Sequence, residues 1–208
     1  MDTNIILIIF FIIVIGIVVF LIFFLKRKKQ NETAQENVKA NYSQEQLWRG
    51  LNNQFSKMYE SGKYDEAIPL AEDALNVAKE IFGPSHTQTA TSLNNLAALY
   101  KAKGNFFEAE PLYKQAVSIW EKTLGQKHQN IASTYNNLAD LYTNTEKYNL
   151  AEEYYKMAIE IFEKTLGKNH PNTITVMENF ATLYRKMGKN DKATILEELV
   201  RKIRSKKG

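Results

Sequence analysis

A segment of 42 residues occurs twice in direct succession, without a gap, in the middle of this chain. Residues 89–130 and 131–172 are identical at 20 of the 42 aligned positions. A fixed period of this length indicates a stacked array of one supersecondary unit, in which each unit buries its apolar face against its neighbours. The period extends in both directions and defines units at 47–88, 89–130, 131–172 and a shorter 173–208.

The apolar residues within each unit follow helical spacing. In the third unit they recur every three or four positions from Ile131 to Tyr142, and again from Tyr148 to Phe162. This pattern predicts two amphipathic helices joined by a turn. Gly-Lys or Gly-Asn marks the turn in the other units, whereas the third has Glu146-Lys147, a weaker turn signal. The sequence therefore predicts an all-α fold in which helix-turn-helix units stack as an α-solenoid.

Each of the first three units closes with Gly-x-x-His, and these loops contain all the histidines of the chain, His86, His128 and His170. The glycines stand where a left-handed residue would end a helix. Equivalent positions of successive units lie about one helix layer, roughly 10 Å, apart, whereas a Zn–N bond is only about 2.0–2.1 Å long. The histidines therefore cannot share a metal ion, and we expect them to close the loops, with a cap to the following helix.

The residues of the middle units resemble tetratricopeptide repeats (TPR). Leu96, Ala97, Tyr100 and Gly104 follow that motif, and the usual TPR period is 34 residues. The longer period and the Leu-Gly-x-x-His loop are similar to the repeats of kinesin light chains and their prokaryotic relatives. Leu93-Asn94-Asn95-Leu96-Ala97 is one of the most specific marks of that subtype. The resemblance implies a right-handed α-solenoid over residues 43–208.

The resemblance is weaker in the two outer units. Gln54 and Phe55 replace the Leu-Ala pair in the first, and Glu178-Asn179-Phe180 replaces Asn-Asn-Leu in the fourth. Terminal repeats are commonly atypical because one of their faces meets water or a linker. Nothing outside the repeats matches a kinesin light chain, so the resemblance implies the fold and the binding mode but not a motor partnership.

The family resemblance also implies that the first helix of each unit lines a concave groove that binds a peptide or helix of another protein. Asparagines spaced by 42 residues form a ladder there, and an Asn amide can pair with the backbone of an extended peptide. The alternative is that each Asn pairs with the neighbouring repeat and only supports stacking. The ligand's charge stays open, because the groove combines basic and acidic positions. The predicted groove residues are Asn52, Asn94, Lys101, Asn136, Asp140, Thr143, Glu178 and Arg185.

An unbroken apolar run, Ile5–Leu25, precedes the repeats. At 1.5 Å per residue it is roughly 31 Å long as a helix, enough to cross a bilayer core of about 30 Å. A cleaved signal peptide would have a shorter apolar region after a basic segment, whereas here only Asp2 carries a side-chain charge before the run. The sequence therefore predicts a retained transmembrane helix that contacts the lipid bilayer.

Basic residues follow this span directly, at Lys26, Arg27, Lys28 and Lys29. Because positive flanking charges stay on the cytoplasmic side, we expect residues 1–4 outside, residues 26–42 as a basic juxtamembrane segment and polar linker, and the repeats in the cytoplasm. Ser43 and Gln46 have the pattern of a capping box that would begin the repeat domain. The alternative is that residues 30–41, which lack Gly and Pro, extend the membrane helix.

Composition excludes several classes of function. The chain has no cysteine, so no thiolate metal site or cysteine nucleophile is expected. Residues 42–200 hold 17 basic and 20 acidic residues, which argues against a nucleic-acid-binding stripe. No phosphate-binding loop or catalytic constellation is present, so we expect neither an enzyme nor a cofactor.

Together these features predict a membrane-anchored scaffold or adaptor that binds a partner protein. Two alternatives remain. The repeats could lie outside the cytoplasm as an assembly or chaperone-like factor of a cell envelope, or the fourth unit could stack on a second copy in a homo-oligomeric structural membrane protein.

Overall fold

The computed structural model describes residues 3–205, with the side chains of residues 21–33, 35–36, 40 and 42–205. This part of the chain is helical and contains no strand. Its helices are α1 (Thr3–Glu60), α2 (Tyr64–Phe82), α3 (Thr87–Ala102), α4 (Phe106–Leu124), α5 (Gln129–Asn144), α6 (Tyr148–Thr165), α7 (Pro171–Lys186) and α8 (Asn190–Ser205).

The chain divides into two compact units, Met1–Leu47 and Trp48–Gly208. Among the residues whose side chains are described, no helix has a stretch long and apolar enough to cross a bilayer. The span expected at Ile5–Leu25 lies largely outside those residues, because the side-chain description starts at residue 21.

One expected helix start is absent. The capping box at Ser43 and Gln46 would begin a new helix, but α1 continues through both residues to Glu60. The intervening residues 26–42 contain neither Gly nor Pro, so nothing in them interrupts a helix that has already begun. The capping-box prediction was therefore wrong.

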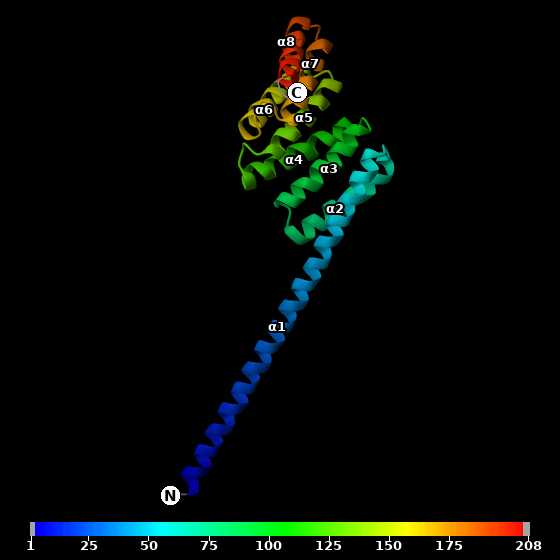
Figure 1. Cartoon of the computed structure of the whole chain (residues 1–208). Helices are drawn as coiled ribbons and strands as arrows, with labels where there is room; N and C mark the ends of the chain where they lie inside the picture. Colours follow the sequence, from blue (N-terminus) through cyan, green and yellow to red (C-terminus); the bar gives the residue numbers. More distant parts are fainter. Residues whose placement is uncertain (1–2, 206–208) are drawn as a thin grey trace. The chain divides into compact units, whose positions relative to one another are not determined.

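The second unit is a stack of helical hairpins. Helices α3 and α4, α5 and α6, and α7 and α8 pack as pairs, and each pair also contacts the preceding one through α2 with α3, α4 with α5, and α6 with α7 (Figure 1). These contacts join elements that are close in sequence, as expected for an α-solenoid. The predicted all-α, solenoid-like stack of helical hairpins is confirmed.

Small residues at equivalent positions let the paired helices approach closely. One such position of the second helices always carries a fully buried alanine: Ala67, Ala109, Ala151 and Ala193. Large buried side chains, among them Tyr113, Tyr155 and Phe162, fill the space between neighbouring pairs. These small and large residues belong to the main hydrophobic core, and the fourth unit adds a second, smaller cluster of Ile174, Met177, Val200 and Ile203.

The loops confirm most of the expected helix ends. In the weak turn of the third unit, Glu146 adopts a φ of 60° where the other units have glycine. Gly83 and Gly125 end their helices with positive φ but with ψ of 160° and 158°. That region is accessible essentially only to glycine, and it differs from the left-handed helical conformation that we expected.

The histidines cap the following helices. The Nδ1 atoms of His86, His128 and His170 accept hydrogen bonds from backbone N–H groups two residues later, at 3.2, 3.2 and 3.1 Å. The predicted structural role is thus confirmed. The described residues contain no group of three or more His, Asp or Glu that could hold a metal ion.

Candidate partner-binding groove

The asparagine ladder of the first helices contributes hydrogen bonds between repeats. In the first repeat, Asn52 Oδ1 accepts from Asn95 Nδ2 at 2.9 Å, and Asn52 Nδ2 donates to the Trp48 carbonyl at 2.8 Å. Both functional groups of this amide are therefore occupied within the fold, as the stacking interpretation expects.

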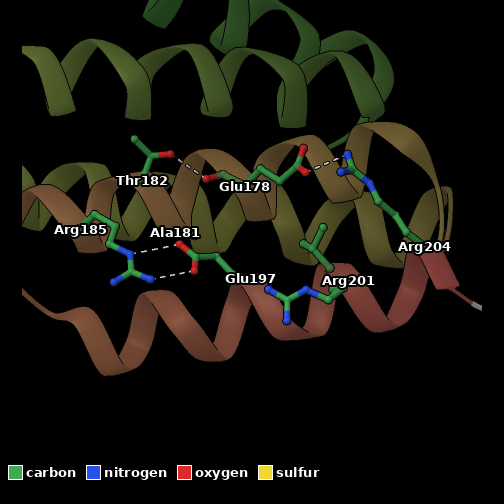
Figure 2. Close-up of a pocket in the computed structure, with 8 residues that line it drawn as sticks. Glu178, Ala181, Thr182, Arg185, Glu197, Arg201 and Arg204 are labelled. Atoms are coloured by element: carbon green, nitrogen blue, oxygen red, sulfur yellow. Dashed lines mark hydrogen bonds and ion pairs between the residues drawn. The ribbon is translucent and has the colours of Figure 1, made fainter.

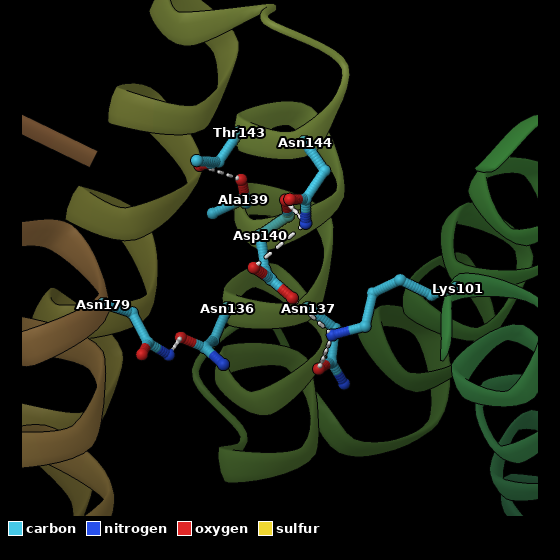
Figure 3. A network of polar contacts seen from close by, with 8 residues as sticks. All are labelled: Lys101, Asn136, Asn137, Ala139, Asp140, Thr143, Asn144 and Asn179. Atoms are coloured by element: carbon cyan, nitrogen blue, oxygen red, sulfur yellow. Dashed lines mark hydrogen bonds and ion pairs between the residues drawn. The ribbon is translucent and has the colours of Figure 1, made fainter. Parts of the chain in front are cut away.

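The two central asparagines use only their carbonyl groups in this way. Asn94 Oδ1 accepts from Thr134 Oγ1 at 2.9 Å. Asn136 Oδ1 accepts from Asn179 Nδ2 at 3.0 Å, as Figure 3 shows. Within the described residues, neither Nδ2 group has a hydrogen-bond acceptor. Asn94 and Asn136 can therefore support stacking and still donate to a ligand backbone.

Replacing both central asparagines should lower stability as well as binding. Asn94→Ala with Asn136→Ala removes the hydrogen bond from Asn179, worth about 1 kcal/mol, and the one from Thr134, whose hydroxyl can still donate to the Asn130 carbonyl. We expect the free energy of unfolding in denaturant to fall by about 1–2 kcal/mol. A double variant as stable as the native protein would mean that these bonds do not support the stack.

Lys101 and Asp140 pair with each other across two repeats. Lys101 Nζ lies 2.8 Å from Asp140 Oδ2 and also donates to Asn137 Oδ1 at 3.3 Å. The Lys101 side chain is only 15% exposed. Its charge is therefore largely compensated inside the fold, and it adds little attraction for an acidic ligand.

Thr143 does not lie on the open surface of the groove. It is buried, and its hydroxyl donates to the Ala139 carbonyl in the same helix at 2.8 Å. The expected register placed Thr143 one turn after Asp140 on the same face. In the structure the Thr143 side chain instead points into the interior of the helical hairpin. Burial in the same region raises the pKa of the Tyr155 hydroxyl.

Glu178 and Arg185 of α7 are both paired with residues of α8. Arg204 Nη2 lies 2.8 Å from a Glu178 oxygen, and Arg185 donates to both carboxylate oxygens of Glu197, at 3.1 and 2.8 Å. The sequence did not indicate these partners, because it did not show which face of α8 turns toward α7.

An open cavity of about 200 Å³ lies between α5 and α7. Ser133 and Thr175 are exposed at its edge, and Asn136, with its donor group available, also lines it. A hydroxyl can both donate and accept. This part of the predicted groove therefore offers hydrogen-bonding groups of both kinds at an accessible surface.

A second set of repeated contacts was not expected from the sequence. The hydroxyls of Tyr142 and Tyr184 donate to Glu110 and Glu152 of the preceding repeat, at 2.9 and 3.2 Å. Glu152 also pairs with Lys156 at 2.7 Å. The 42-residue spacing of both the tyrosines and the glutamates could have revealed this column.

The Glu152 carboxylate should make stability depend on pH. Its pKa is lowered by the hydrogen bond from Lys156 despite partial burial, and Tyr184 lowers it further. Because the folded pKa is below that of the unfolded chain, the stabilisation is present above about pH 4.3 and is lost as the pH falls through the folded pKa.

We therefore expect Glu152→Gln to be less stable than the native protein at pH 6, by about 1.5 kcal/mol. The difference should shrink toward pH 3 in urea unfolding experiments. Glu153→Gln, a change at the exposed neighbouring residue, is the matched control. A constant difference at all pH values would contradict this role for Glu152.

Comparison with known proteins identifies the class of fold. A tetratricopeptide repeat family model matches residues 58–122, 88–164 and 130–206. These overlapping matches extend over well more than half of the chain, and the chain therefore belongs to the tetratricopeptide repeat family. No curated protein matches it in sequence.

The chain is similar in structure to kinesin-light-chain-like TPR proteins. BtubC (BKLC) from P. vanneervenii superposes with a TM-score of 0.66 at 26% identity, over 73% of this chain and 61% of that chain. This chain thus spans less than two thirds of that protein. The nearly identical TPR-like repeats of a putative kinesin light chain from Podosopora anserina give a TM-score of 0.62 at 27% identity, over 77% and 76% of the two chains. A variant of the latter gives 0.64 at the same identity.

Proposed function

We propose that this protein is a single-pass membrane scaffold that holds a segment of a partner protein in its concave groove. Membership of the tetratricopeptide repeat family supports a role in protein–protein interaction. The observation that carries the proposal is the open cavity between α5 and α7, where Ser133, Asn136 and Thr175 offer hydrogen bonds to an extended backbone.

The apolar sequence of residues 5–25 supports the membrane anchor, and Lys26–Lys29 support a cytoplasmic location for the repeats. An anchor of this kind would concentrate the captured partner at the membrane surface, since tethering makes later encounters effectively intramolecular. The repeats would act by binding a partner protein and would not catalyse a reaction.

The orientation can be tested with a reporter that is active only after export, fused after Gly208. We expect no reporter activity, while a cytoplasmic reporter at the same position should be active. The reverse result would refute the cytoplasmic assignment and favour the envelope-side alternative.

Groove binding can be tested by filling the cavity without removing a hydrogen bond of the fold. Ser133→Gln with Thr175→Gln adds bulk at two exposed positions whose side chains have no hydrogen-bond partner among the described residues. Ser118→Gln, at an exposed position of α4, is the matched control. Partner capture is measured by crosslinking and pulldown of the full-length protein in native membranes.

We expect the double variant to lose at least about tenfold of the captured partner, which corresponds to about 1.4 kcal/mol. The control should capture the native amount, and both variants should keep the native melting temperature. Equal capture by the double variant and the control would rule out this part of the groove.

A further inference from the structure

One face of each inner repeat is covered by the first helix of the next. In the third repeat this face contains Tyr155 and Phe162 of α6, which are 1% and 2% exposed. The Tyr155 ring stacks on Phe180 of α7, with 5.5 Å between the ring centroids. The packed face is thus aromatic and buried from solvent.

The fourth repeat carries charged residues on the equivalent face. At the equivalent positions, 42 residues later in the sequence, Tyr155 corresponds to Glu197, Ile159 to Arg201 and Phe162 to Arg204. No later helix of the described residues covers them. A pocket of about 460 Å³ opens there between α7 and α8 (Figure 2).

The charges in this pocket do not balance. Two arginines already have carboxylate partners, since Arg185 pairs with Glu197 and Arg204 pairs with Glu178, in both cases at 2.8 Å. Arg201 also lines the pocket and helps to lower the pKa of Glu197 electrostatically after Arg185, but its guanidinium has no hydrogen bond or ion pair within the described residues (Figure 2). Three guanidinium groups therefore face two carboxylates, over a floor that includes Ala181 and Val200.

A polar outer face by itself would only keep the last repeat soluble. Fully paired charges would serve that purpose, whereas an unpaired guanidinium in an open pocket favours an anion. A carboxylate suits it best among protein groups, because it can accept two parallel hydrogen bonds from one guanidinium. The apolar floor suits a small aliphatic side chain next to that carboxylate.

We propose that this pocket, formed by α7 and α8, anchors an acidic amphipathic helix of a partner protein, with Arg201 binding a carboxylate. The docked helix packs on the fourth repeat in the same way that α7 packs on the third repeat. The inference rests on the proposed interaction function and extends it by naming the chemistry of one partner surface. Arg201 lies outside the cavity at Ser133 and Thr175, so the two sites can fail separately.

The test uses the full-length protein in detergent micelles and a fluorescent synthetic peptide. The peptide is an alanine-based helix with alternating Leu and Glu at i and i+4 positions of one face, and its twin has Gln in place of Glu. Affinities are measured by fluorescence anisotropy for the native protein, Arg201→Gln and Arg201→Lys. Lys202→Gln, an exposed neighbour that does not line the pocket, controls for net charge.

We expect the Glu peptide to bind about tenfold more tightly than its twin, as one charge-assisted contact allows. Arg201→Gln should abolish that preference at an unchanged melting temperature, whereas Arg201→Lys should retain most of it. Lys202→Gln and the Ser133→Gln/Thr175→Gln variant should both bind like the native protein.

Several results would overturn the proposal. Absence of peptide binding, or an equal loss in Arg201→Gln and Lys202→Gln, would show that the pocket does not select a carboxylate. Loss of binding in the Ser133→Gln/Thr175→Gln variant would place the peptide in the groove instead. Self-association of the native protein that Arg201→Gln abolishes would identify a second copy as the occupant.

Discussion

Two arginines in the apolar segment should release the protein from membranes. Ile13→Arg and Ile17→Arg place two charges near the middle of residues 5–25. Each arginine costs about 3 kcal/mol at the centre of a membrane helix on insertion scales, so the pair costs about 6 kcal/mol. We expect the native protein to stay in the membrane pellet after alkaline carbonate extraction and the double variant to appear in the supernatant.

The matched control is Ile13→Leu with Ile17→Leu, which keeps the segment apolar and should remain in the pellet. Circular dichroism of the extracted variant should show the helical signal of folded repeats, since the substitutions lie outside their core. Complete extraction of the native protein would contradict the membrane anchor.

The largest loss of stability should come from the buried aromatic residue between the third and fourth repeats. Phe162 is 2% exposed and belongs to the main hydrophobic core. Truncating a buried phenylalanine removes its burial and leaves a cavity, at a cost of about 3–5 kcal/mol. Phe162→Ala should therefore lower the free energy of unfolding by that amount in guanidinium chloride.

Phe107→Ala is the control, because Phe107 is 89% exposed and should change stability by less than about 0.5 kcal/mol. Repeats contact only their neighbours, so hydrogen exchange in Phe162→Ala should increase most in α7 and α8. Uniformly faster exchange from α2 to α8 would contradict nearest-neighbour stacking.

The repeat period was sufficient to predict the helical hairpins, the histidine loops and their order along the chain. These features depend on local patterns, such as apolar spacing and helix ends, that recur in every unit. The continuity of α1 through Ser43 follows the alternative in which residues 30–41, which lack Gly and Pro, extend the preceding helix. The capping signal has no effect there, because the preceding segment is already helical.

The contacts of the groove were harder to predict, because they depend on side-chain direction across helix pairs. Lys101 and Asp140 were expected to face a ligand, yet they pair with each other between repeats. Thr143 has the register of a groove residue but turns inward. Helical spacing places a residue on a face, but the neighbouring helix decides whether that face is open.

We propose that the groove near Ser133 holds a partner protein at the membrane. A photoreactive amino acid placed at residue 133, and in a separate variant at residue 118, tests it in intact cells. We expect a discrete crosslinked product from position 133 and none from position 118, with its yield reduced when Thr175→Gln is added. Equal products from both positions, or none from either, would contradict partner binding in this groove.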